Sequence, residues 1–203
     1  MATPENELKY ELSETAYHYL LASLSPEGEA QVFRNAYYVV ETDVGRRDWV
    51  LRLRQREASV GGELTLKVGR QVSPGSFSSV EHTALVQSDL PADWEETEPL
   101  RVFRQEISTE ALVCRGAAKN ERRLLIAPLG PAPHWELDCT TLPNGKVFYE
   151  LEIEFPPETA PTAEQIAGFR AELEEWMFDQ GVQAVPGKKT KYRRFLDSIG
   201  ARY

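Results

Sequence analysis

Two acidic stretches at opposite ends of the chain carry carboxylates at every second position. The first, "ENELKYEL" (5–12), holds Glu5, Glu7 and Glu11 together with Lys9. Alternate residues of a β-strand point to the same face, so a strand here would gather these groups on one side. Carboxylate oxygens are the ligands that Mg²⁺ and Mn²⁺ prefer. The second stretch, "YELEIEF" (149–155), repeats the pattern with Glu150, Glu152 and Glu154.

Basic side chains alternate in the same way in the middle of the chain. In "WVLRLRQRE" (49–57), the polar face carries Arg52, Arg54 and Arg56, and in "ELTLKVG" (63–69) it carries Lys67. Arginine and lysine on several strands can hold a polyanion from different sides. Further charged positions stand on two later strands: Arg122 and Arg123 on opposite faces of one, Glu136 and Asp138 on one face of the other.

A solvated sheet face would explain any one of these strands, because half-buried sheets alternate in this way. Taken together, the strands indicate a closed sheet, since about eight strands enclose a narrow lumen. Charges inside a lumen are costly unless a ligand of complementary charge fills it. A polyphosphate with a divalent cation would satisfy both the acidic and the basic strands.

The composition limits the other possibilities. The chain has 203 residues and a net charge of −9, which argues against general affinity for nucleic acid or an anionic membrane surface. No apolar run is long enough for a transmembrane helix, and the first residues do not resemble a secretion signal. With two cysteines, Cys114 and Cys139, and no CxxC pair, we expect a cytoplasmic, reduced protein.

Periodicity and turn residues predict the elements that must position these charges. Thr162 and Gln165 form a capping box that begins the clearest helix, 162–182. Further helices are expected at 12–24, within 90–108, where Pro99 should interrupt the helix, and at 188–200. Strands are expected at 5–12, 31–43, 49–57, 63–69 and 79–85, with hairpins within 110–129, centred near 116–120, and at 134–155. Turns or loops are expected at 25–30, 44–48, 58–62 and 70–78.

About eight strands joined by hairpins, with about four helices, predict an antiparallel sheet with helices packed outside it. We therefore expect an α+β fold in one domain, 1–203. Neither a zinc site nor a serine triad is expected, because the three histidines, His18, His82 and His134, are scattered and no GxSxG motif occurs.

In its ordered motifs, the chain resembles the CYTH family, the triphosphate tunnel metalloenzymes. "ENELK" matches the ExExK signature, "LRLRQRE" the R-x-R strand and "LTLK" the lysine strand that follows. "SVEH", "KNERR", "WELDCT", "YELEIEF" and "GKKTKYRRF" then resemble later family segments in the same order. The resemblance implies a closed eight-stranded antiparallel β-barrel, a tunnel, flanked by helices. It also implies divalent-metal-dependent chemistry on a triphosphate.

Carried over by position, the resemblance implies three groups of site residues. Lys9, Asp138 and Glu81 would be catalytic. The triphosphate would be bound by Lys9, Arg52, Arg54, Lys67, Arg122, Lys189 and Lys191, with Arg123 as the alternative to Arg122 and with Lys191 preferred to Lys189. The metal, Mg²⁺ or Mn²⁺, would be held by Glu5, Glu7, Glu150, Glu152 and Glu154, among which Glu152/Glu154 and Glu150/Glu152 are alternative pairs.

The expected function is therefore metal-dependent hydrolysis of a small triphosphate. Inorganic triphosphate is the most economical substrate, and thiamine triphosphate and nucleoside triphosphates are the other candidates. Cys139 and Thr140 stand where some family members have a basic residue, which counts against the thiamine-triphosphate branch. Alternatives are an adenylate cyclase of the same fold and a non-catalytic module that binds polyphosphate or a nucleotide. No nucleic-acid or membrane partner is expected, and the protein would be a monomer or a homodimer.

Overall fold

The computed structural model describes residues 2–43, 49–56, 59–130, 132–159 and 161–201. Its strands are β1 (Ala2–Leu12), β2 (Gln31–Val39), β3 (Trp49–Arg56), β4 (Gly62–Ser73), β5 (Ser76–Val86), β6 (Val113–Ile126), β7 (His134–Thr141), β8 (Val147–Phe155) and β9 (Ala184–Pro186). Its helices are α1 (Glu14–Ser23), α2 (Glu98–Glu106), α3 (Ala163–Asp179) and α4 (Lys191–Ser198). Short 3₁₀ turns lie at Glu41–Asp43, Pro91–Trp94 and Pro157–Thr159.

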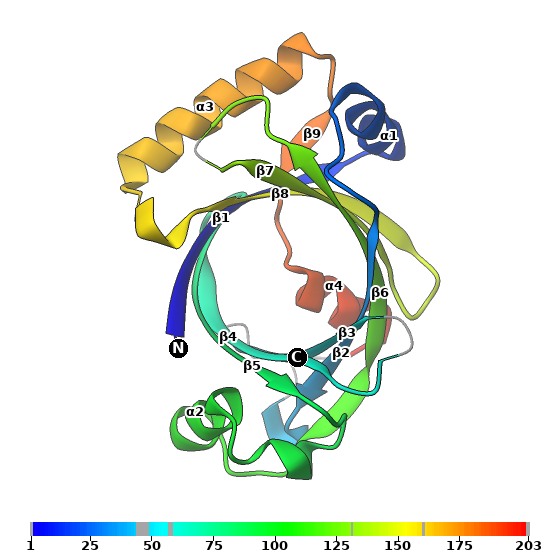
Figure 1. The fold of residues 1–203 in the computed structure, drawn as a ribbon, viewed down its shortest axis with the longest axis vertical. Coiled ribbons are helices and arrows are strands. Elements are labelled where there is room, and N and C mark those ends of the chain that lie inside the picture. Colours follow the sequence, from blue (N-terminus) through cyan, green and yellow to red (C-terminus); the bar gives the residue numbers. More distant parts are fainter. Residues whose placement is uncertain (1, 44–48, 57–58, 131, 160, 202–203) are drawn as a thin grey trace.

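Strands β1 to β8 form a closed antiparallel barrel, as the sequence predicts. The strand order is β5-β4-β3-β2-β6-β7-β8-β1, and β5 pairs with β1 to complete the ring. Figure 1 looks along this ring, with α1 and α3 on one outer side, α2 on the opposite side and α4 inside the outline of the barrel. The fold is therefore an α+β barrel flanked by helices.

Alternation along each strand decides which side chains point into the lumen and which point away from it. On β3, Leu51 and Leu53 are fully buried on the outer face, where they belong to the apolar cluster that includes Leu100 and Phe103 of α2. The opposite side of the barrel packs in the same way against α1 and α3, through side chains such as Leu151 of β8. Both helical layers cover outward-facing apolar residues, so the charged positions between them face inward.

Strand β1 has three partners, which place its central residue at a junction. Ala2–Leu8 pair with β5, Asn6–Leu12 pair with β8, and Tyr10–Leu12 pair with β9. Around Lys9, three backbone hydrogen bonds form a triangle: Lys9 N–H donates to the carbonyl of Gly75 (2.8 Å), Gly75 to Gly187 (3.0 Å) and Gly187 to Lys9 (2.8 Å). Gly75 has φ of +73°, and a Cβ there would lie 2.9 Å from Cβ of Pro186. The junction therefore requires glycine at this position.

Three local predictions are wrong. The segment 110–129 contains no hairpin: β6 is one strand that pairs with β2 and β7, and Gly116, with φ of +126°, lies at a register shift in its pairing with β2. The loop predicted at 70–78 is a tight hairpin, because β4 and β5 pair up to Ser73 and Ser76. Pro99 does not interrupt α2 but lies in its first turn, where a missing N–H costs nothing.

The other elements agree with the predictions within a few residues. The hairpin at 134–155 forms with Gly145 in its turn at φ of +80°, and α3 begins with the Thr162–Gln165 capping box. The turn predicted at 44–48 lies outside the described residues, as do residue 57, the last of the strand predicted at 49–57, and residue 58, the first of the turn predicted at 58–62. Within the described ranges, no helix is both long and apolar enough to cross a membrane.

Candidate active site inside the barrel

The inward-facing side chains enclose a cavity of about 700 Å³. Of the predicted site residues, those that line it are Glu5, Glu7, Lys9, Arg52, Arg54, Lys67, Glu81, Arg122, Glu152, Glu154, Lys189 and Lys191. Asp138 and Glu150 are fully buried and are not among the described residues that line the cavity. The structure therefore brings residues from both ends and the middle of the chain into one chamber.

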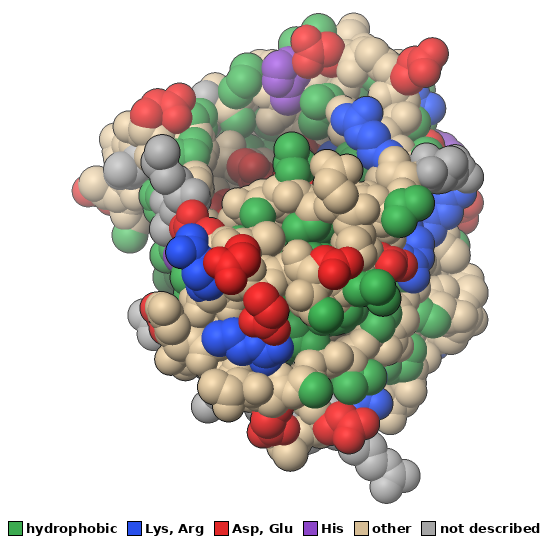
Figure 2. All heavy atoms as spheres, turned by 60° about the horizontal axis from the view of Figure 1, so that its bottom comes forward, with side chains coloured by type: hydrophobic (Ala, Val, Ile, Leu, Met, Phe, Trp, Pro, Cys, Tyr) green, Lys and Arg blue, Asp and Glu red, His purple; other side chains and the backbone are tan. Residues whose placement is uncertain are grey.

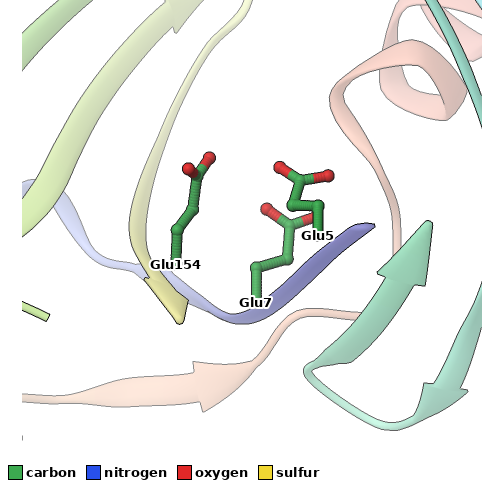
Figure 3. Close-up of side chains that lie close together, drawn as sticks. All are labelled: Glu5, Glu7 and Glu154. Atoms are coloured by element: carbon green, nitrogen blue, oxygen red, sulfur yellow. The ribbon is translucent and has the colours of Figure 1, made fainter. Parts of the chain in front are cut away.

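Three carboxylates form an acidic cluster where β1 and β8 pair. Glu7 and Glu154 are register partners, and together with Glu5 they offer oxygens that all lie within 4.8 Å of one another. Figure 3 shows the three side chains extending from the two strands into the same space. Glu154 is accessible to solvent, but its partial desolvation inside the barrel, and then the negative charges of Glu136, Glu5 and Glu7, raise its pKa to about 9. A cation among these oxygens would relieve that repulsion, and an all-oxygen donor set fits Mg²⁺ or Mn²⁺.

Lysine side chains partly neutralise this cluster. Lys67 forms ion pairs with Glu5, with Glu7 (3.3 Å) and with Glu81 (3.4 Å), while Ser79 Oγ donates to Glu5 at 2.7 Å. Glu154 has no ion pair among the described residues. Lys67 thus lies on the acidic side of the chamber, and Glu81 contacts the site through it.

Next to the acidic cluster, Glu152 is surrounded by cations. Its Oε1 accepts from the ammonium groups of Lys9 and Lys191, each at 2.5 Å, and its Oε2 accepts from Arg122 Nη2 at 3.0 Å. Burial opposes ionisation here, but Lys191, Lys9 and Arg122 together hold the pKa of Glu152 well below its usual range. Glu152 therefore fixes the positions of three cations at the boundary of the cavity.

Behind Glu152, Asp138 holds two of the same cations. Arg122 binds it in a bidentate manner, through Nε at 2.8 Å and Nη2 at 2.7 Å, and Lys191 Nζ lies 2.9 Å away. Asn120 Nδ2 donates a further bond at 3.1 Å. Burial would raise the pKa of Asp138, but Arg122 and Lys191 lower it to about 2. These contacts suit a residue that orients Arg122 and Lys191.

Across the cavity, Arg52 and Arg54 of β3 form a basic wall without carboxylate partners among the described residues. Arg54 Nε donates to Asn35 Oδ1 at 3.2 Å, and its guanidinium lies 4.9 Å from the centre of the Phe33 ring. Burial first, and then the neighbouring charges of Arg52 and Arg122, lower the pKa of Arg54 to about 10. Among the described residues, the positive charge on this wall is not held in an ion pair, so it is available to an anion in the cavity.

The alternatives left open by the sequence now have different surroundings. Arg122 points inward, whereas Arg123 lies near Glu121 (3.8 Å) on the other face of β6. Lys191 enters the buried network, whereas Lys189 is half exposed and pairs with Asp197 at 2.7 Å. Of the three glutamates on β8, Glu154 joins the acidic cluster. Glu152 is bound by three cations, and Glu150 lies beneath α4, 3.1 Å from Lys191.

Sequence reasoning left two acids that line the cavity, Glu63 and Glu136, out of the predicted site. Glu136 forms an ion pair with Arg122, and burial is the main reason that its pKa is raised to about 7. The sequence did contain a signal for Glu136, because it stands two residues before Asp138 on β7 and so faces the same side of the strand. The family motif carried only the aspartate, so the second inward-facing acid of the same strand was not assigned a role.

Charges on the outside are arranged differently. Figure 2 shows lysine and arginine side chains beside aspartate and glutamate side chains on the outer face that it presents. In the lumen, the acidic cluster and the basic wall are separated on opposite strands. A converging group of carboxylates facing two arginines that have no carboxylate partner among the described residues is therefore a feature of the cavity.

Comparisons with known proteins support the fold. A protein from Hippeastrum, described as a candidate adenylyl cyclase with a dominant triphosphatase activity, has a TM-score of 0.78 and 22% identity over 95% of both chains. A protein described as a candidate adenylate cyclase from Bacillus halodurans gives 0.67 and 22%, over 96% of this chain and 98% of that one. A Pyrococcus horikoshii protein gives 0.62 and 16%, over 95% and 98%.

No family model matches the chain, and no curated protein matches it by sequence. The similarity to solved structures confirms the resemblance to the CYTH proteins at the level of the fold. The chain shares the barrel fold of these solved structures, and its charged cavity lies within that barrel.

Proposed function

We propose that this chain hydrolyses a small triphosphate in a reaction that depends on Mg²⁺ or Mn²⁺, with inorganic triphosphate as the most economical substrate. One observation carries the proposal: the basic wall of Arg52 and Arg54 and the acidic cluster of Glu5, Glu7 and Glu154 line the same 700 Å³ cavity. A polyanion alone would satisfy the first set, and a cation alone the second. A triphosphate with a divalent cation satisfies both.

In this proposal, Glu5, Glu7 and Glu154 hold the cation, because their oxygens converge in the cavity. The oxygens of Glu136, Asp138 and Glu152 also converge, but Arg122 already forms ion pairs with all three. When bound, a divalent cation polarises phosphoryl oxygens and lowers the pKa of water. Glu81 and Asp138 act through Lys67 and Arg122, which they contact.

Hydrolysis of a triphosphate joins water oxygen to the terminal phosphorus and breaks its bond to the bridging oxygen, giving phosphate and diphosphate. Such transfer needs positioning and charge stabilisation more than covalent catalysis. Arg52 and Arg54 bind the phosphate chain from one wall, while Lys9 and Arg122 face it from the other. These cations stabilise the negative charge that develops on the leaving diphosphate.

The Hippeastrum protein supports hydrolysis over cyclisation, since its description reports a dominant triphosphatase activity. The Bacillus protein is described as a candidate cyclase, so cyclisation of ATP is the second function to test. The two reactions give different products: phosphate from hydrolysis, and cyclic AMP with diphosphate from cyclisation. Inorganic triphosphate, thiamine triphosphate and ATP should each be incubated with the protein and Mg²⁺ or Mn²⁺.

We expect phosphate release from inorganic triphosphate that is abolished by a chelator. Glu154→Gln should reduce the rate by more than about a hundredfold, since even groups that only contact a metal ligand contribute about 10- to 100-fold. Glu158→Gln, an exposed position four residues further along, is the matched control and should retain wild-type activity. Tight binding without product would contradict hydrolysis and favour a non-catalytic module.

A further inference from the structure

Thr65, on the inner face of β4, has a buried hydroxyl without a partner. Its exposed fraction is 1%, and it lines the cavity beside Lys67. Among the side chains that the structure describes, Thr65 has the one buried hydroxyl with no hydrogen-bond partner. Thr140, the comparable inward threonine of β7, is equally buried, but its hydroxyl donates to Asn120 Oδ1 at 2.7 Å.

An unsatisfied hydroxyl at this position is costly to the protein. Leaving a buried donor or acceptor without a partner costs about 1–3 kcal/mol. Valine has nearly the same shape, favours strands at least as strongly and carries no polar atom. For stability alone, valine would therefore be the better residue, and a hydroxyl here indicates a partner that arrives with the ligand.

The residue opposite Thr65 on β3 is Arg52, its register partner. Arg52 Nε is also buried without a hydrogen-bond partner, and Arg52 has no ion pair among the described residues. Register partners on neighbouring strands have side chains on the same face, with Cβ atoms about 4.5–5.5 Å apart. Two unused donors, one N–H and one O–H, thus stand side by side on the inner face of the barrel.

We infer that Thr65 and Arg52 form a two-donor subsite for one phosphoryl group, in which the Thr65 hydroxyl donates to a phosphate oxygen. The assignment rests on the proposed function, because it takes the ligand to be a triphosphate. Thr65 is then a substrate-binding residue on the strand next to the basic wall. Its hydroxyl adds a hydrogen bond that Arg52 and Arg54 alone do not provide.

The test uses three variants of the whole chain. Thr65→Val removes the hydroxyl and keeps the shape, Thr65→Ser keeps the hydroxyl, and Thr83→Val changes the exposed threonine opposite Thr65 on β5. Two quantities are measured for each: the KM for inorganic triphosphate, from phosphate release with Mn²⁺, and the melting temperature without ligand.

We expect the KM of Thr65→Val to rise about tenfold, which corresponds to about 1.4 kcal/mol of binding free energy. The melting temperature of that variant should be equal to or above that of the wild type, because an unsatisfied group has been removed. Thr65→Ser should keep a KM within about twofold of the wild type, since its hydroxyl can make the same bond. Thr83→Val should change neither quantity.

An unchanged KM in Thr65→Val, with an active wild type, overturns the subsite and leaves the proposed function intact. A lowered melting temperature in Thr65→Val also overturns it, because that result means that the protein itself satisfies the hydroxyl. A wild type that neither hydrolyses nor binds triphosphate overturns the proposed function, and the subsite with it.

Discussion

The cavity has two charged regions that differ in how their charges are balanced. Around Glu152 and Asp138, each carboxylate contacts cations from other elements, namely Lys9, Arg122 and Lys191. On β3, Arg52 and Arg54 face the same cavity without a carboxylate partner among the described residues. The balanced network holds its members in fixed positions, whereas the basic wall keeps its charge available for a ligand. Loss of a residue should therefore affect stability in the first region and affinity in the second.

The largest effect is expected from breaking the network with Arg122→Met. This change leaves the fully buried Asp138 without its bidentate partner. Removing one member of a buried ion pair typically costs about 3–5 kcal/mol, and the free energy of unfolding from urea denaturation should fall by that amount. Arg123→Met, on the outer face of the same strand, is the matched control and should have a small effect. Similar losses in both variants would contradict a buried network centred on Arg122.

A smaller effect, and of a different kind, is expected from Arg54→Gln in the basic wall. Hydrogen bonds to charged groups contribute about 1.5–3 kcal/mol, so the KM for inorganic triphosphate should rise by about one to two orders of magnitude. Stability should be unchanged or slightly higher, because burial and the charges of Arg52 and Arg122 already disfavour the ionised form of Arg54. Steady-state kinetics and denaturation of the same preparation measure both. A loss of stability as large as that of Arg122→Met would remove the distinction between the two regions.

The smallest effect is expected at the junction that supports Lys9, from Gly75→Ala. A methyl group at Gly75 would meet Pro186 and the carbonyl of Lys9, at a φ that disfavours alanine. Such backbone strain costs about 1–3 kcal/mol, and the melting temperature should fall accordingly. Gly145→Ala also has a positive φ but nothing within 4 Å, so it separates backbone strain from the close contact. Equal losses in the two variants would show that contact at the junction contributes nothing.

The sequence predicts the barrel well because its strands alternate so regularly. In β3, for example, leucine alternates with arginine over residues 51–54, which is the pattern of a strand with one apolar and one charged face. The prediction of a hairpin within 110–129 was wrong. It was based on Gly116 and Asn120, which are typical turn residues. In the barrel, both are held within one long strand by pairing with β2 and β7, which local sequence does not reveal.

Within the site, the sequence predicts which residues face the lumen but not which of them pair with each other. Glu150, Glu152 and Glu154 are equivalent by spacing, yet each lies at a different depth and has different neighbours. Part of the difference arises from α4, whose Lys191 contacts both Glu150 and Glu152. A contact between residues 39 positions apart depends on tertiary structure, so spacing within β8 could not distinguish the three acids.

The three-partner arrangement of β1 also has a consequence for how the protein is made. Strand β1 pairs with β5, β8 and β9, all of which follow it in the chain, and β8 and β9 are synthesised well after it. Closure must bring together segments from Ala2 to Pro186, and contacts of such long sequence separation slow folding. During translation, β1 therefore remains unpaired with β8 and β9 until late. Its alternating charges help to keep the unpaired strand from associating with other chains.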